Sequence, residues 1–182
     1  MKNSRLLLVI SLLFMPCLVS DVNAQSSINS IGLANVKLTQ EEKEERNKRA
    51  ALASVEAINA GNTDSALKDA APDIINYGNG NIPPVKGIDQ VKAGLRMFTA
   101  ALPIEKAENL VAIADGDWVM VWGQWSGTWK EDIMGQKATG KPYKKREVEI
   151  FRFNHEGKIT EHHSVQSICE VARQIGMKIP GQ

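Results

Sequence analysis

Apolar and polar side chains alternate along residues 146–166, and the alternation is interrupted once, at residues 154–157. Alternation with a period of two indicates strands, and a short glycine-containing break between two such runs is typical of a β-hairpin. One face of this hairpin is rich in ionisable and hydrogen-bonding groups, so we interpret it as the floor of a pocket. That face carries Glu147, Glu149, Phe151 and Phe153 on the first arm and Thr160, His162, Ser164 and Gln166 on the second.

Helical spacing dominates the chain before residue 103. Thr39 and Glu42 have the spacing of a capping box, and the charged run that follows leads into an apolar stripe that ends at residues 59–62. A second apolar stripe predicts a helix over residues 88–101, which Pro103 ends.

A short helix and a strand are predicted between these two helices. Thr63 or Asp64 can cap a helix over residues 65–70. Pro72 ends that helix, because the residue before a proline avoids the helical region. Residues 73–77 then form a strand.

The pattern from residue 104 onward is that of strands. Residues 107–114 and 118–129 form two strands joined by an Asp-Gly turn, which favours a hairpin. A loop over residues 130–145 leads to the hairpin described above, and helical spacing returns over residues 167–176. Helices gathered before strands predict an α+β fold. In this fold N-terminal helices cover a curved, cone-shaped β-sheet that is mixed but mostly antiparallel.

All four tryptophans lie in residues 118–129 and divide between the two faces of that strand. Trp125 and Trp129 share the face that we assign to the pocket. Trp118 and Trp122 lie on the opposite face, where together with Arg152 they would be exposed to water. We therefore predict that two copies associate through that face as a homodimer.

The start of the chain has the organisation of a secretory signal peptide. Lys2 and Arg5 precede an apolar run at residues 6–15 that is too short to span a bilayer, and small residues follow up to Ala24. Residues 1–24 therefore predict export to the periplasm or the medium, with no membrane attachment after cleavage.

A lipoprotein is the alternative, with Cys17 as the lipidated first residue. Pro16 occupies the position where lipoprotein signals carry a small residue, which favours soluble export. Residues 25–38 carry little pattern and are expected to form a flexible leader, and residues 39–182 are long enough for one domain with its own core.

Several classes of function are disfavoured by composition and spacing. The chain carries 22 basic and 21 acidic residues with no concentrated basic face, so nucleic acid is not an expected partner. His162 and His163 point to opposite faces and His155 lies in the turn, so no metal site is expected. The sequence shows no phosphate-binding glycine loop or nucleophile elbow, and we expect no cofactor. Cys169, left without a second cysteine after signal removal, is expected to be a buried small apolar residue of the last helix.

Short segments along the chain carry a family resemblance. They are residues 57–62 (AINAGN) with Leu67, residues 84–87 (PVKG) before a helix, residues 149–153 (EIFRF), residues 157–159 (GKI), and Glu161 with His162. Over residues 41–177 the chain resembles the SnoaL-like polyketide cyclase group of the nuclear-transport-factor-like (ketosteroid-isomerase-like) α+β cone superfamily. The resemblance implies the fold, while the reaction must be argued from the site, because the superfamily holds many enzymes and non-catalytic pockets.

The same resemblance implies an acid/base carboxylate on the last strand, at the position of Ser164. A serine at its ordinary pKa cannot remove a carbon-bound proton, so the known cyclase mechanism does not transfer directly. Glu149 and His162, one on each arm of the hairpin, are the remaining candidate proton carriers.

Two functions of different class follow. The first is a cofactor-free acid/base enzyme of the cyclase or isomerase type, acting on a small hydrophobic carbonyl compound with His162 and Glu149 as catalytic residues. The second is a non-catalytic module that binds a hydrophobic ligand or dimerises, in which the Glu-His bond only holds the floor together. Tyr77 is the expected oxyanion donor of the enzyme. The residues expected to line the pocket are Tyr77, Phe98, Trp125, Trp129, Phe151, Ser164 and Gln166.

Overall fold

The computed structural model describes residues 37–179. The predicted signal peptide, residues 1–24, and all but the last two residues of the predicted leader lie outside the described residues. The elements, in chain order, are α1 (Gln40–Asn59), α2 (Thr63–Ala66), β1 (Ala70–Gly78), β2 (Val85–Lys86), α3 (Ile88–Ala101), β3 (Ile104–Asp115), β4 (Trp118–Thr128), β5 (Pro142–Phe153), β6 (Ile159–Gln166) and α4 (Ile168–Ile175).

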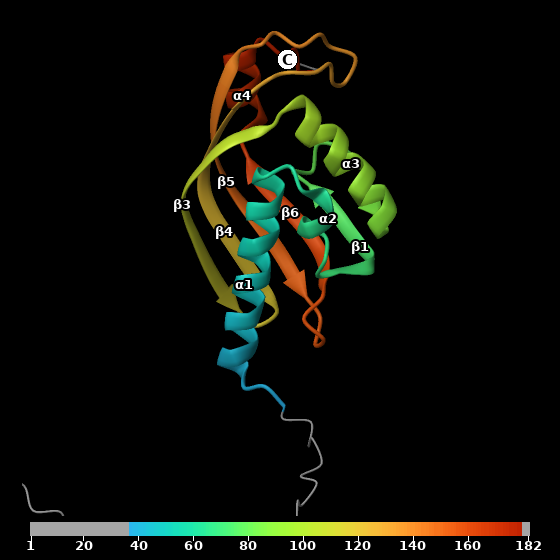
Figure 1. Cartoon of the computed structure of the whole chain (residues 1–182), viewed down its shortest axis with the longest axis vertical. Helices are drawn as coiled ribbons and strands as arrows, with labels where there is room; N and C mark the ends of the chain where they lie inside the picture. The colour runs from blue at the N-terminus through green and yellow to red at the C-terminus, as the bar shows by residue number, and fades with distance from the viewer. Residues whose placement is uncertain (1–36, 180–182) are drawn as a thin grey trace, which may run out of the picture. The chain divides into compact units, whose positions relative to one another are not determined.

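Six strands form one curved, unclosed sheet in the order β2-β1-β6-β5-β4-β3. The β1–β6 pairing is parallel and the other four pairings are antiparallel. Helices α1, α2 and α3 lie across one face of the sheet, and α4 lies near the end where the β4–β5 loop projects (Figure 1). The predicted α+β fold and the hairpin of β5 and β6 are therefore confirmed.

Local sequence explains where the main helices lie. The Thr39 side chain accepts a hydrogen bond from the Glu42 amide, and the Glu42 carboxylate accepts one from the Thr39 amide, so both members of the predicted capping box are in place. Ala51 and Val55 of α1 and Val91 of α3 are buried against the inner face of the sheet. These contacts hold the helices over that face and give it an apolar border.

Three predicted boundaries differ from the structure. Helix α2 begins at Thr63 because the Asn62 side chain, rather than Thr63 or Asp64, accepts a hydrogen bond from the Ser65 amide, 3.0 Å away. Strand β1 begins at Ala70 and includes Pro72, which the sheet tolerates because the register shifts between Ala70 and Ile75.

The third difference is the start of β5, predicted at residue 146 and found at Pro142. Residues 142–145 continue the ladder with the end of β4, where Lys145 pairs with Trp125. The sequence predicted a loop over residues 130–145, which contain Gly135, Gly140 and Pro142, and so left Lys145 outside the strand. Lys145 is in fact buried.

A second apolar cluster lies toward α4, separate from the main core. Trp129, Tyr143 and Ile175 are buried there. The side-chain amide of Gln174 on α4 donates a hydrogen bond of 2.8 Å to the backbone carbonyl of Lys144. Cys169 is half-buried on this helix, not fully buried as expected. No helix among residues 37–179 is long and apolar enough to cross a membrane.

Candidate functional site

Glu149 and His162 meet on the inner face of the sheet. Phe151 of β5 pairs with His162 of β6, and Glu149 lies two residues along β5, on the same face. His162 Nε2 lies 2.8 Å from a Glu149 carboxylate oxygen. Both side chains remain about a fifth accessible to water, 21% and 20%. The predicted pair is therefore formed, and both of its side chains can be reached by water.

Asn76 of β1 holds the other side of the imidazole. Its amide oxygen lies 2.9 Å from His162 Nδ1, an arrangement in which Nδ1 donates. When Nε2 donates to Glu149 as well, the ring carries two protons. Rotation of the Asn76 amide would present its NH2 group to Nδ1 and suit the neutral ring, so this contact accommodates both protonation states of His162.

The pair also sets the ionisation of Glu149. Burial acts to raise the pKa of this carboxyl, but the hydrogen bond and positive charge of His162, with Lys145, outweigh it and hold the pKa below the ordinary value. Glu149 is therefore an ionised acceptor beside a histidine that can carry a proton.

A second charged pair, Lys145 and Glu147, lies next along the same face of β5. The two side chains form an ion pair and are 8% and 2% exposed. Burial, then the negative charge of Glu149, raises the pKa of Glu147 to about 7. The Lys145 ammonium lies 5.9 Å from the Phe98 ring centre and 5.8 Å from that of Trp125, within range of cation–π attraction.

Sequence reasoning missed Lys145, Glu147 and Asn76 as site residues. Lys145 and Glu147 could have been found from their spacing, because residues 145, 147 and 149 are two apart and therefore lie on the same face of a strand. No local signal identified Asn76, because it reaches His162 through the parallel β1–β6 pairing.

Three other predicted lining residues contact or border these pairs. The Phe151 ring centre lies 5.1 Å from that of His162, tilted by 44°. Ser164 is directly opposite Glu149 in the ladder, and the Gln166 side-chain oxygen accepts a hydrogen bond of 3.4 Å from Lys145. With Phe98 and Trp125, they form a site of apolar walls around a polar floor.

The structure places two predicted pocket residues elsewhere. Tyr77 lies on the outer face of the sheet, where it stacks on His163 at 4.5 Å with an interplanar angle of 4°. The reason is parity, because the preceding residue, Asn76, points inward. Trp129 belongs to the second apolar cluster, and its indole donates to the Glu131 carbonyl at 2.7 Å. Neither residue can fill the role assigned from the sequence.

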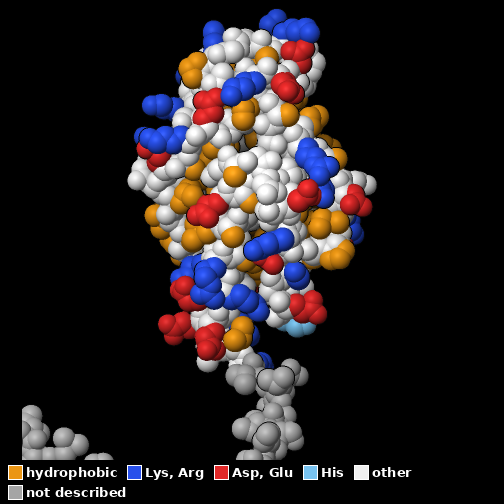
Figure 2. Space-filling view, viewed as in Figure 1, with side chains coloured by type: hydrophobic (Ala, Val, Ile, Leu, Met, Phe, Trp, Pro, Cys, Tyr) orange, Lys and Arg blue, Asp and Glu red, His pale blue; other side chains and the backbone are white. Residues whose placement is uncertain are grey.

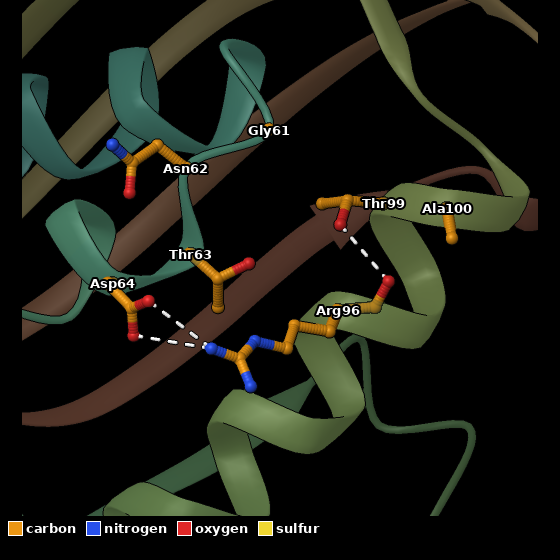
Figure 3. Close-up of a pocket in the computed structure, with 7 residues that line it drawn as sticks. All are labelled: Gly61, Asn62, Thr63, Asp64, Arg96, Thr99 and Ala100. Carbon is orange, nitrogen blue, oxygen red and sulfur yellow. Dashed lines mark hydrogen bonds and ion pairs between the residues drawn. The ribbon is translucent and has the colours of Figure 1, made fainter.

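Two hollows occur at other places. One, of about 560 Å³, lies between the α1–α2 junction and the C-terminal half of α3, where Arg96 is drawn paired with Asp64 (Figure 3). The other, of about 830 Å³, lies on the outer sheet face beside the Tyr77–His163 stack. Among the described residues no group of three His, Cys, Asp or Glu side chains is placed to hold a metal ion.

The outer sheet face is apolar and open. Arg152 lies over the Trp118 ring, 5.4 Å from its centre, and donates a hydrogen bond of 2.7 Å to Glu161. By contrast, acidic and basic side chains are interspersed over the surface of the molecule on the side where the helices lie (Figure 2). The large exposed apolar residues of the outer face are Val111, Ile113, Trp118, Met120, Trp122 and Val165.

The curved, unclosed sheet and its helical cover define a nuclear-transport-factor-like α+β domain. Residues 48–175 match the family model of the SnoaL-like polyketide cyclases, and the chain belongs to this family. The resemblance inferred from short segments is thus confirmed.

Solved structures agree with this fold. A protein assigned as a polyketide cyclase from Xanthomonas campestris pv. campestris has a TM-score of 0.67 at 21% identity, over 73% of this chain and 98% of its own. One from Pseudomonas putida KT2440 has a TM-score of 0.65 at 20% identity, over 71% and 97%. An LEH-like epoxide hydrolase of M. tuberculosis has a TM-score of 0.57 at 16% identity, over 73% and 91%. A search of curated proteins finds no match. At these identities the likeness concerns the fold alone.

Proposed function

We propose that this domain is a cofactor-free acid/base enzyme of the cyclase or isomerase type, which moves a proton on a small hydrophobic carbonyl compound. The observation that carries the proposal is the 2.8 Å contact between His162 and Glu149 on the inner face, with both groups still reachable by water. A general base must lie within hydrogen-bond reach of the proton it removes, and the exposure of this pair leaves it open to a substrate. The Glu149 carboxylate also orients the His162 ring and can stabilise it when it carries a proton.

The chemistry needs proton transfers and, for a cyclisation, one new carbon–carbon bond, with no oxidant or reductant. The C–H bond beside the carbonyl breaks, its electron pair is delocalised onto the carbonyl oxygen, and the proton passes to the Glu149–His162 pair. Return of this proton to another atom completes an isomerisation. In a cyclisation the carbanion attacks a second carbonyl carbon, and the oxygen of that carbonyl takes the proton back from the pair. Phe151, Phe98 and Trp125 supply the apolar surroundings that a small hydrophobic substrate requires.

Proton exchange into a probe ketone tests this proposal. We expect the wild-type protein to accelerate deuterium exchange at the acidic carbon of bicyclic aryl ketones in D2O, followed by proton NMR. His162→Gln keeps most of the side-chain volume but removes the proton carrier, so the exchange rate should fall about a hundredfold. His163→Gln is the matched control, because this neighbouring histidine points to the outer face.

The competing function is a pocket that binds a hydrophobic ligand without turnover. The serine at the family's carboxylate position favours it. In that case the wild-type protein would bind the ketones with no acceleration of exchange, and His162→Gln would lower affinity and melting temperature together. That pattern would reject the enzyme.

We further propose that two copies associate through the outer sheet face. Trp122 is 38% exposed and Met120 48% exposed on this face, and large contiguous apolar surfaces mark interaction sites. Sedimentation should show a dimer that Trp122→Glu dissociates. Met97→Glu is the control, since Met97 is 62% exposed but lies on α3. A wild-type monomer at every concentration would contradict the dimer.

Export belongs to the same proposal and rests on the pattern of residues 1–24. Mass spectrometry of the exported protein should find a chain that begins at Gln25. A chain that keeps Met1, or one that begins at a lipidated Cys17, would contradict soluble export after cleavage.

A further inference from the structure

Glu147 is a buried carboxyl group to which the proposed reaction assigns no role. It is 3% exposed. One of its oxygens, Oε2, contacts the Lys145 ammonium and forms no hydrogen bond within the described part of the chain. A buried ionised carboxylate without hydrogen bonds is costly, so its protonation state needs an explanation.

Glu149 provides that explanation. The two glutamates are two residues apart on one face of β5, which separates their Cα atoms by about 6.6 Å, a spacing that two glutamate side chains can bridge. Two carboxyl oxygens can share a hydrogen bond only if one carries a proton. A shared proton also removes the repulsion between two buried negative charges.

The charges around Glu147 limit how many protons the site holds. Its own strand contributes Lys145, Glu149 and, further along, the buried phenol of Tyr143, whose pKa is raised by burial and by Glu147; β6 contributes His162. Lys145 and Glu149 balance each other. The remaining two groups, Glu147 and His162, are then neutral together when they hold one ionisable proton between them. If Glu147 holds it, the carboxyl and the imidazole are both neutral. If His162 holds it, the carboxylate and the imidazolium have opposite charges that cancel.

We propose that Glu147 is a second proton carrier of this site, linked through Glu149 to His162 in a three-membered relay that holds one exchangeable proton. This inference rests on the proposed acid/base function. It adds a group, Glu147, that holds the proton at the start of a cycle, so that His162 is neutral and can accept the proton of the substrate. When His162 takes the substrate proton, the carboxyl proton of Glu147 can move to Glu149, so that protons are available on both His162 and Glu149 for return to the product. Every step is a proton transfer, and no oxidant, reductant or co-reactant is needed.

Infrared spectroscopy tests the shared proton without a substrate. The carbonyl stretch of a protonated carboxyl group should be present below neutral pH and disappear as the pH rises through about 7. Glu147→Gln should remove this band. Glu161→Gln is the matched control, because Glu161 is a β6 carboxylate that pairs with Arg152 and His163 on the outer face, and the band should remain. Absence of the band in the wild-type protein, or its survival in Glu147→Gln, would overturn the shared proton.

Ketone exchange then tests whether the proton is used. Glutamine can replace a neutral carboxyl as a hydrogen-bond donor but cannot carry the proton, so Glu147→Gln should lower the exchange rate at least tenfold with the binding of the ketone unchanged. An unchanged rate would mean that Glu147 only positions Glu149, and would overturn the relay. If the wild-type protein shows the Glu147 band but no exchange, the enzyme proposal fails while the shared proton stands.

Discussion

Glu147→Gln should change how stability depends on pH, and the direction follows from the raised pKa of this carboxyl. In the unfolded chain Glu147 releases its proton near its ordinary pKa of 4.5, whereas in the folded protein it keeps the proton until about pH 7. The folded state therefore binds more protons than the unfolded state between these values, and its stability falls as the pH rises across this window. Below pH 4.5 both states are protonated, and above about pH 7.5 both are ionised, so this contribution is constant on either side.

The size of the effect comes from the same two values. An interval from 4.5 to about 7, at about 1.4 kcal/mol for each pH unit, amounts to roughly 3 to 4 kcal/mol. Little solvent screening reduces it, because the side chain is almost fully buried. Glutamine has no proton to lose, so the stability of Glu147→Gln relative to wild type should rise by roughly 3 to 4 kcal/mol between pH 4.5 and pH 8.

Urea unfolding at a series of pH values measures this difference. The change with pH is more informative than the value at one pH, because any packing difference between glutamate and glutamine is the same at every pH. Glu161→Gln provides a control of opposite sign. The hydrogen bond from Arg152 lowers the pKa of Glu161, so the stability that Glu161 contributes is present above its unfolded pKa and is lost as the pH falls. A stability difference between Glu147→Gln and wild type that does not vary from pH 4.5 to pH 8 would refute the burial of a protonated Glu147.

Two further predictions concern the scaffold. Gly127→Ala should lower the free energy of unfolding in urea by at least about 2 kcal/mol, because the added Cβ would collide with the backbone oxygen of Pro103. Gly94→Ala is the control, because nothing lies near the position of its Cβ on α3, and it should be neutral or stabilising by about 0.5 kcal/mol or more. Thr39→Ala removes the side-chain half of the α1 capping box and should cost about 1 kcal/mol by the same measurement.

The fold was predictable because local signals and tertiary contacts agree along most of the chain. The capping box at Thr39 and the apolar stripe of α3 mark helix boundaries that the structure reproduces to within a residue. The turn between β5 and β6 is equally local, with the Asn154 side chain accepting from the Lys158 amide at 2.9 Å. Agreement between such local choices and the overall fold is what makes a sequence fold uniquely.

The candidate site was only partly predictable, because its members come from three strands. Parity within one hairpin was sufficient to place Glu149 beside His162. It could not place Tyr77, since the inward or outward direction of β1 depends on a parallel pairing between segments 86 residues apart, Asn76 and His162. Lys145 was missed for a different reason, because burial of a lysine depends on the partners that it finds, here Glu147 and two aromatic rings.

The serine at the family's carboxylate position does not remove a carboxylate from the inner face. Ser164 and Glu149 are direct partners in the β5–β6 ladder, and side chains at such positions have Cβ atoms about 5 Å apart on one face of the sheet. The Glu149 side chain is also longer than that of aspartate by one methylene group, so it can reach across the space that a small serine leaves open. Its contact with His162, on the same strand as Ser164, shows that the carboxylate reaches toward β6. In this chain the negative charge therefore comes from the neighbouring strand and is paired with a histidine, a side chain that can both accept and donate a proton.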